Sequence, residues 1–424
     1  YSDHMVAVDW DAENDWHDAR VTPYAPLTLD PASLVLHYAQ AVFEGLKAYR
    51  HADGSIWTFR PDVNAGRFRQ SAERLGLPEL PSELFLQSLK ELVQSDHDWV
   101  PRTPESSLYL RPFMIANESS LSVRGADKVA YYVIGSPAGP YFSSGVTPVP
   151  IWVSTQRTRA ARGGTGYAKC AGNYAGSLAP LKDARKNGCP QVLFLDSEHG
   201  QFLEELGGMN IFVVQKDGTL VTPALSDSIL PGVTRASIIE LARAEGRTVH
   251  ERPISITEVR DGIASKQITE IFACGTAALI FPISALKSEE FSYGNTNTAA
   301  GPVTLALRQQ LLDLGRVVVV RGQVLVEPER VGRQHAVDRC GRPLHHAFED
   351  QLLVQRVGAV HVGDGFRLFR VTHRRRGAMG VQIVDLAIQT LHGQTHAAGR
   401  AFARGGDHVM AVRIGRIAGD LSID

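Results

Sequence analysis

One lysine lies in a long run of small residues, Gly163-Gly-Thr-Gly-Tyr-Ala-Lys-Cys-Ala-Gly-Asn-Tyr-Ala-Gly-Ser-Leu178. Glycine lets the backbone approach a ligand closely. An ammonium enclosed in such a site loses hydration, which lowers its pKa and frees the amine to form a Schiff base. Lys169 is therefore a candidate nucleophile, and a surface lysine on a flexible loop is the alternative that this segment leaves open.

An anion site is expected where Pro231-Gly232 precedes an amphipathic helix over residues 236–244. The free N–H groups of Val233 and Thr234, together with the Thr234 hydroxyl, can bind phosphate with help from the helix dipole. Plain helix capping is the ordinary alternative.

Two further segments offer a carboxylate and a set of backbone donors. Glu205 stands ahead of a Gly-Gly turn and an apolar strand, where a carboxylate can keep a heterocyclic nitrogen protonated. The small residues 273–278 offer N–H groups for a phosphate or carboxylate. A solvated loop acid and a tight strand crossing are the alternatives. Together, the lysine, phosphate cradle, carboxylate and N–H groups are what pyridoxal 5′-phosphate requires.

These groups need a scaffold, and the chain of 424 residues, 44% apolar, is long enough for two domains. Short apolar runs at 130–135, 191–195 and 210–214 predict buried strands, and they alternate with helical segments, so a mixed α/β class is expected. We expect a smaller domain over 1–138, a linker rich in glycine and proline over 139–149, and a larger domain over 150–315.

Residues 316–424 form an atypical tail rich in arginine and histidine. They hold 16 arginines, 10 acidic residues and no lysine, so their net charge is +6 against −7 for residues 1–315. An out-of-frame or disordered ending and a genuine arginine-rich appendage are both compatible with this composition. A non-enzymatic module that binds nucleic acid through Arg374-Arg-Arg376 is a further alternative, although no aromatic residues are interleaved with these charges.

The net charge of −1 gives no overall field that would recruit nucleic acid or an anionic membrane. The longest uncharged apolar stretch, Ile271–Leu286, is too short to span a bilayer. Four cysteines, Cys170, Cys189, Cys274 and Cys340, lie far apart, which suggests neither zinc nor a disulfide framework. We expect a cytoplasmic protein that binds no metal, nucleic acid or membrane. Its natural start is expected upstream of Tyr1, and no export leader follows.

The sequence from Tyr1 to about Leu314 resembles the branched-chain amino acid aminotransferases, pyridoxal-phosphate enzymes of fold type IV. The resemblance lies in six blocks, which are Leu36–Tyr49, Leu108–Pro112, the Lys169 segment, Glu205–Asn210, Leu230–Arg235 and Gly275–Ala277. It implies two mixed α/β domains with the active site between them, and a homodimer.

The resemblance also implies the cofactor contacts. Lys169 would form the Schiff base and then move the proton, Glu205 would face the pyridine nitrogen, and Tyr174 would bond the ring hydroxyl. The phosphate would be held by a group of four residues, Arg67, Val233, Thr234 and Thr276.

The implied substrates are L-leucine, L-isoleucine and L-valine, whose amino group passes to 2-oxoglutarate to give branched 2-oxo acids and L-glutamate. Phe43 and Tyr109 would line the pocket, and Arg111 would help glutamate bind. Tyr38, lent by a second subunit, and the Ala277 N–H would lie near the α-carboxylate.

The sequence departs from the family at several positions. Gly208, expected in the substrate site, replaces a threonine of many relatives, and Ala278 and Phe281 stand where eukaryotic members carry a redox C-x-x-C. After Leu314 the family's closing strand is replaced, and 317–320 are expected to fill the edge that its loss exposes on the larger domain. Alternatives within the fold type are a D-amino acid aminotransferase and an aminodeoxychorismate lyase, and a third is an inactive product with a damaged C-terminus.

Overall fold

The computed structural model describes residues 1–141, 146–294 and 299–317, followed by separate strands at 322–326, 353–362, 365–374, 381–382, 388–390, 402–403, 412–414 and 421–423. Side chains are described as far as residue 313. The chain divides into two compact units, Tyr1–Pro328 and Glu329–Asp424.

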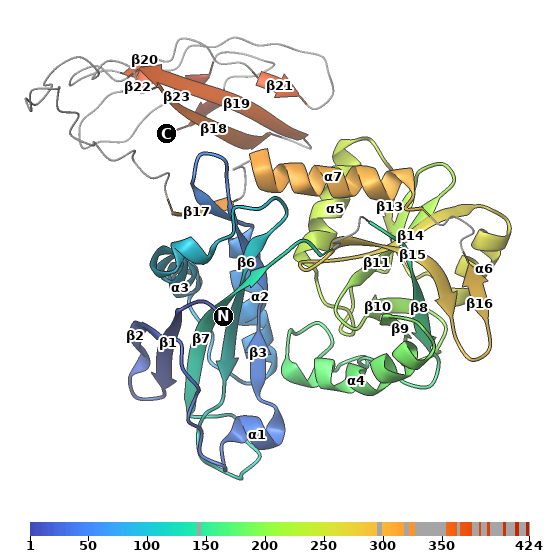
Figure 1. Ribbon diagram of the computed structural model, residues 1–424, viewed down its shortest axis with the longest axis horizontal. Helices are drawn as coiled ribbons and strands as arrows, with labels where there is room; N and C mark the ends of the chain where they lie inside the picture. The colour runs from blue at the N-terminus through green and yellow to red at the C-terminus, as the bar shows by residue number, and fades with distance from the viewer. Residues whose placement is uncertain are drawn as a thin grey trace, which may run out of the picture. The chain divides into compact units, whose positions relative to one another are not determined.

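The first sheet of the larger unit has the strand order β17-β5-β4-β6-β7-β1-β2, with β3 paired to β6 (Figure 1). Its neighbouring strands run antiparallel. The strands are β1 (His4–Asp11), β2 (Asp15–Pro23), β3 (Ala41–Phe43), β4 (Leu46–Arg50), β5 (Ile56–Phe59), β6 (Ser107–Ile115), β7 (Lys128–Ala138) and β17 (Gly322–Val326).

Helices α2 (Pro61–Arg74) and α3 (Ser82–Ser95) cover this sheet, while α1 (Leu34–Tyr38) and the short 3-10 helix at His97–Trp99 lie in its connections. The aromatic rings of Phe68, Phe85 and Tyr131 meet in the core between helices and sheet, and Phe68 lies 5.5 Å from Phe85 and 5.6 Å from Tyr131 between ring centroids. These three side chains are fully buried, so the sheet has a core of its own.

The second sheet has the order β10-β9-β8-β15-β14-β11-β12-β13, with β16 paired to β15. It mixes parallel pairs, such as β8 with β9 and β8 with β15, and antiparallel pairs, such as β11 with β14. The strands are β8 (Val149–Ser154), β9 (Gln191–Leu195), β10 (Leu203–Leu206), β11 (Asn210–Gln215), β12 (Leu220–Thr222), β13 (Val249–Glu251), β14 (Ile268–Gly275), β15 (Leu279–Lys287) and β16 (Ser292–Gly294).

Four helices accompany the second sheet: α4 (Ala171–Lys186), α5 (Val233–Ala244), α6 (Ile256–Ala264) and α7 (Pro302–Val317). Apolar side chains of α5 and α7 share one buried cluster with β11 and β14, whereas α6 packs into a separate cluster with the other face. Two sheets with helical layers confirm the predicted mixed α/β class. The boundaries 1–138, 139–149 and 150–315 stay our proposal.

The locally patterned elements form where the sequence predicted them. The runs at 130–135, 191–195 and 210–214 lie in β7, β9 and β11. The helix expected over 236–244 begins three residues earlier, at Val233, and Gly232 is its N-cap, in extended backbone.

The strand after α7 corrects one expectation. Val317 ends α7 instead of extending the second sheet, and residues 318–320 lie outside the described residues. The next strand, β17, pairs antiparallel with β5 in the first sheet, with Gly322 opposite Phe59. The outer edge of β5 thus receives the backbone hydrogen bonds that an edge strand otherwise leaves open.

In the unit Glu329–Asp424 the structure describes β18 (Leu353–Val362), β19 (Gly365–Arg374) and β21 (Ile388–Thr390) in one sheet, and the pairs β20–β22 and β23–β24. These short pairs are β20 (Val381–Gln382), β22 (Phe402–Ala403), β23 (Val412–Ile414) and β24 (Leu421–Ile423). Whether this segment is a genuine appendage or an out-of-frame ending stays a prediction.

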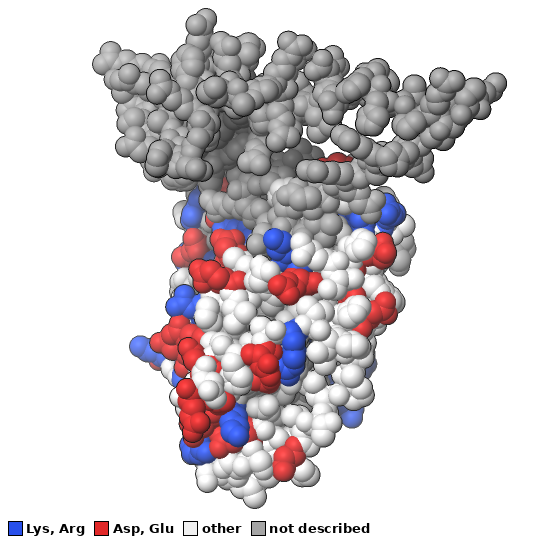
Figure 2. Space-filling view, turned by 90° about the vertical axis from the view of Figure 1, so that its left-hand side faces the viewer, with Lys and Arg blue, Asp and Glu red and all other residues white. Residues whose placement is uncertain are grey.

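The surface carries both signs of charge. Figure 2 shows basic and acidic side chains interspersed on the face it presents, without a broad patch of one sign. Among the residues that the structure describes, no helix is both long and apolar enough to cross a bilayer.

Candidate active site

A cavity of about 190 Å³ within the larger unit gathers residues from both sheets. Every site residue predicted from the sequence except Tyr38 lines it, namely Phe43, Arg67, Tyr109, Arg111, Lys169, Tyr174, Glu205, Gly208, Val233, Thr234, Thr276 and Ala277. These residues come from positions as far apart as 43 and 277, so the fold alone brings them together.

Lys169 presents its amine to this cavity from just before α4. Its backbone N–H donates to the Ser71 hydroxyl at 2.9 Å and its carbonyl accepts from the Phe43 N–H at 3.0 Å, so the first sheet and α2 hold it in place. Its Nζ lies 2.7 Å from the Tyr174 hydroxyl. Burial, with Arg67 close by, lowers the pKa of Lys169 to about 8. A neutral amine is therefore accessible near neutral pH, as a nucleophile requires.

The start of α5 forms an anion cradle on another wall. Gly232 caps the helix without a side-chain hydrogen bond, so the first-turn N–H groups have no side-chain cap, and the hydroxyl residues Thr234 and Thr276 line the same cavity. A Cβ at position 232 would lie 2.1 Å from Asn210 Oδ1, which explains why glycine is needed there. This geometry suits a phosphate group.

Arg67 reaches the cradle from α2 and is oriented by Glu44, a residue that sequence reasoning missed. Its Nε donates to Glu44 Oε1 at 2.7 Å, its Nη2 to Oε2 at 2.8 Å, and its Nη1 to the Pro231 carbonyl at 3.0 Å. Burial alone would raise the pKa of Glu44, but Arg67, Lys169 and Asn64 together hold it below its ordinary value. The available sequence signal was an acidic residue within the apolar run Ala41-Val-Phe-Glu-Gly45.

Glu205 supplies a buried carboxylate to the cavity from β10. It accepts a hydrogen bond from the Leu230 N–H at 2.9 Å and one from Asn210 Nδ2 at 3.2 Å. Arg159 lies 2.5 Å away, a partner that sequence reasoning also missed, because nothing in the sequence distinguishes it from the neighbouring Arg157. Burial, partly offset by Arg159, raises the pKa of Glu205 to about 7.

Tyr174 lies on α4, one turn after Lys169. Burial raises the pKa of its hydroxyl well above the ordinary value, so the group keeps its proton and can donate it. Its ring packs against Phe43, with 4.8 Å between centroids.

Aromatic rings and one guanidinium form the remaining wall. Arg111 lies over the rings of Phe43, at 4.7 Å, and Tyr109, at 5.4 Å, and donates to the Tyr109 hydroxyl at 3.0 Å. Its buried Nε has no hydrogen-bond partner in the described part of the chain. The wall therefore combines apolar ring surface with donors that can receive a carboxylate.

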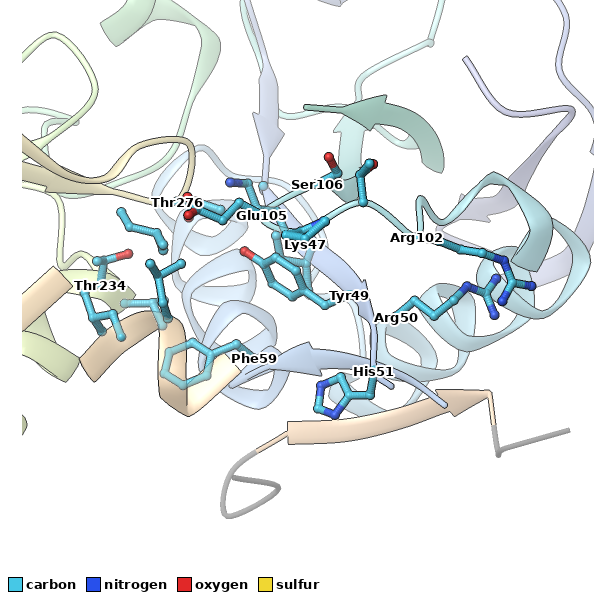
Figure 3. Close-up of a pocket in the computed structure, with 18 of the residues that line it drawn as sticks. Lys47, Tyr49, Arg50, His51, Phe59, Arg102, Glu105, Ser106, Thr234 and Thr276 are labelled. Carbon is cyan, nitrogen blue, oxygen red and sulfur yellow. The ribbon is translucent and has the colours of Figure 1, made fainter. Parts of the chain in front are cut away.

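The Thr276-Ala277 turn between β14 and β15 is tied to the first sheet by Lys47, whose Nζ donates to the Ala277 carbonyl at 2.9 Å. Burial lowers the pKa of Lys47 to about 8. A second cavity, of about 580 Å³, adjoins this turn (Figure 3). Figure 3 shows Thr234 and Thr276 at one end of it and Arg102 at the other.

Tyr38 does not line the cavity. It ends α1, is 41% exposed, and its hydroxyl donates to the Leu121 carbonyl at 2.5 Å. Among the described residues, no group of three or more His, Cys, Asp or Glu side chains is arranged to hold a metal ion.

Comparison with known proteins relates this geometry to one family. The profile of the family described as "Amino-transferase class IV" matches residues 41–286. The branched-chain-amino-acid aminotransferase of Mycobacterium tuberculosis is 51% identical over 320 residues, covering 74% of this chain and 87% of the relative. The branched-chain-amino-acid transaminase 1 of Bacillus subtilis is 49% identical over 287 residues, covering 68% and 80%. The branched-chain amino acid aminotransferase of Thermobaculum terrenum in its PLP form has a TM-score of 0.64 and 26% identity, covering 77% and 99%.

Proposed function

This chain belongs to the class IV aminotransferases, and from that membership we propose that it is a branched-chain amino acid aminotransferase dependent on pyridoxal 5′-phosphate. The reaction moves the amino group of L-leucine, L-isoleucine or L-valine reversibly to 2-oxoglutarate, giving branched 2-oxo acids and L-glutamate. One observation carries the proposal. The enclosed Lys169 amine shares a single cavity with the anion cradle and with the buried Glu205 carboxylate.

The donor set of the cavity fits the cofactor. Its phosphate can be bound by the first turn of α5, by the Thr234 and Thr276 hydroxyls and by the remaining N–H groups of Arg67. Its ring nitrogen can pair with the Glu205 carboxylate. The Tyr174 hydroxyl suits the oxygen on the ring. When bound, the cofactor supplies an aldehyde that condenses with amines and a ring that withdraws electrons from the substrate α-carbon.

Lys169 moves the proton in this proposal. As a neutral amine, its Nζ takes the proton from the α-carbon of the amino acid, and in the return half it delivers a proton to the α-carbon of the 2-oxo acid. A pKa of about 8 suits both directions, because neither protonation state of the amine is strongly favoured near neutral pH. Tyr174, 2.7 Å from Nζ, keeps the amine directed into the cavity.

The aromatic wall accepts two kinds of side chain. Phe43 and Tyr109 offer apolar ring surface to the branched side chains, and Gly208 leaves room beside them. The guanidinium of Arg111, lying over both rings, offers its N–H edge to the second carboxylate of glutamate or 2-oxoglutarate. The N–H of Ala277 is assigned to the α-carboxylate.

We further propose a homodimer in which Tyr38 serves the partner's cavity. The α1 segment lies against residues 118–121, with the Leu34 N–H donating to the Glu118 carbonyl at 3.0 Å. These two segments expose Leu36 and Leu121, and the nearby Val123 is also exposed; the exposed fractions of Leu121 and Val123 are 65% and 84%. Such an apolar surface around a tyrosine favours burial against another copy.

The test is amino transfer by the purified protein loaded with pyridoxal 5′-phosphate. We expect L-glutamate to form from 2-oxoglutarate with L-leucine, and no turnover of D-alanine. Borohydride reduction followed by peptide mass analysis should fix the cofactor on Lys169. The Lys169→Ala variant should lose both activity and label. The Lys182→Ala variant, changed at an exposed lysine on α4, should keep both.

The alternatives have their own signatures in this experiment. Turnover of D-alanine with inert L-leucine would identify a D-amino acid aminotransferase, and release of pyruvate from aminodeoxychorismate would identify the lyase. A labelled Lys169 without turnover of any of these substrates would identify an inactive product that still binds the cofactor.

A further inference from the structure

Arg159 is a buried cation that touches the active site without lining its cavity. It follows β8 and is 7% exposed. Its Nη2 lies 2.5 Å from Glu205 Oε1 and donates to the carbonyls of Gly166 and Ser228 at 2.6 and 2.7 Å. The guanidinium thus joins three separate segments at the back of the cavity.

The two oxygens of Glu205 have unequal surroundings. Oε1 faces Arg159 and accepts the Leu230 N–H, whereas among described residues Oε2 accepts only the Asn210 side chain, at the longer distance of 3.2 Å. One oxygen is therefore fixed by the protein, and the other keeps an acceptor site on the residue that faces the cavity.

Burial opposes the charge on Glu205, and Arg159 is the strongest group that favours it. The other titratable or charged groups facing this carboxylate are Lys169, Arg67, Tyr174, Cys274 and Glu204. Glu204 is itself buried and bonded to the Ser228 hydroxyl, and Arg159 favours its charged form as well, so Arg159 interacts with two carboxylates. Removing one partner of a buried ion pair leaves the other with an uncompensated charge, and that remaining group usually shifts its pKa and becomes neutral.

Building on the proposed function, we propose that Arg159 is a positioning residue that favours the ionised form of Glu205 and orients it so that its carboxylate retains a proton on the pyridine nitrogen of the cofactor. A neutral carboxyl group would offer a donor to that nitrogen instead of an acceptor. Without Arg159, the ring would lose its positive charge and with it much of its ability to withdraw electrons.

The decisive experiment compares two ligands on the folded protein. Binding of pyridoxal 5′-phosphate and of its 1-deaza analogue, which has C–H in place of the ring nitrogen, is measured for wild type, Arg159→Met, Arg159→Lys and Arg157→Met. Arg157 is the matched control, because it is half-exposed and pairs with Asp183 at 2.8 Å.

We expect Arg159→Met to weaken binding of pyridoxal 5′-phosphate at least tenfold and to leave the deaza analogue unchanged or bound more tightly. Arg159→Lys should give an intermediate effect, and Arg157→Met none. Equal weakening of both ligands, or no weakening of either, would overturn the proposal, because it would show a purely structural role or no role.

A second readout needs no cofactor. Carbon-13 NMR of glutamate side chains in the apoprotein, with Glu205 assigned by Glu205→Gln, should show a higher pKa for this carboxyl in Arg159→Met than in wild type. An unchanged pKa would contradict the proposal. If wild type binds neither ligand, the proposed function fails, while this titration still decides whether Arg159 favours the ionised form of Glu205. If Arg159→Met does not fold, the ligand comparison and the titration are both made on Arg159→Lys.

Discussion

Glu44 and Arg67 form a bidentate ion pair with almost no access to solvent. The two hydrogen bonds measure 2.7 and 2.8 Å, and the Glu44 side chain is completely buried. A third N–H of Arg67 is taken by the Pro231 carbonyl, which leaves two of its five donors for an anion. The carboxylate therefore determines which edge of the guanidinium faces the α5 cradle.

Glu44→Gln should lower the free energy of unfolding by about 3 kcal/mol, because Arg67 would keep a buried charge without its counterion. It should also weaken binding of pyridoxal 5′-phosphate. Urea unfolding and cofactor titration measure the two effects. Glu79→Gln is the matched control, since Glu79 accepts from two nitrogens of Arg69 on the surface and should change stability by less than about 1 kcal/mol. Equal effects of the two substitutions would contradict this prediction.

Glu205 should make the apoprotein less stable as pH rises from 4.5 to 7. Its pKa of about 7 in the folded state lies above the ordinary 4.5, so the folded protein binds the extra proton. The bound proton contributes roughly 3 kcal/mol to the free energy of unfolding. This contribution is complete below pH 4.5 and is lost as pH rises through 7. Urea unfolding at pH 5 and 7.5 should show this loss in wild type and in Glu198→Gln, an exposed control, but not in Glu205→Gln.

Lys169 should set the pH dependence of cofactor capture. Because its pKa is about 8 instead of 10.5, the rate should rise tenfold per pH unit below 8 and level off above it. Apoprotein stability should correspondingly increase between pH 8 and 10.5, where the unfolded chain binds the extra proton. Stopped-flow absorbance gives the rate profile, and Lys182→Ala should leave it unchanged. A midpoint near 10.5 would refute the assignment.

Gly208→Ala should narrow substrate choice without loss of folding. A Cβ at this position would lie 3.6 Å from a Tyr174 ring carbon, which is ordinary contact, but it would occupy part of the cavity. We expect kcat/KM for L-isoleucine to fall about tenfold, the lower end of the effect of one methyl group in a tight pocket. Steady-state kinetics test this. Gly207→Ala should have little effect, because a Cβ at position 207 would make only ordinary contact with Ser177, 3.5 Å from its hydroxyl oxygen, and Gly207 does not line the cavity.

The apolar surface around Tyr38 should control assembly. Replacing both Leu121 and Val123 by aspartate should shift the protein toward monomers and reduce transamination, because the charges oppose burial of this surface and remove Tyr38 from the partner's cavity. Sedimentation velocity measures the mass. Leu178→Asp, at a leucine 63% exposed on α4, is the control expected to keep the assembly. A double variant that retains both mass and activity would disprove this interface.

Local patterns in the sequence determined the parts of the site that depend on neighbours along the chain. The Pro-Gly pair ahead of apolar residues at helical spacing predicted the α5 cradle, and the glycine-rich run predicted the enclosure of Lys169. Resemblance to a family supplied the remaining site residues, of which all but Tyr38 line one cavity.

Only the tertiary structure decided how these groups are charged and oriented. Glu44 meets Arg67 across 23 positions, Arg159 meets Glu205 across 46, and Lys47 meets Ala277 across 230. No sequence pattern predicts which residues pair in this way, because each pair depends on how the fold brings two distant segments together. The pairing of β17 with β5 has the same origin. Burial and pairing set the protonation of a side chain, and both are properties of the folded chain.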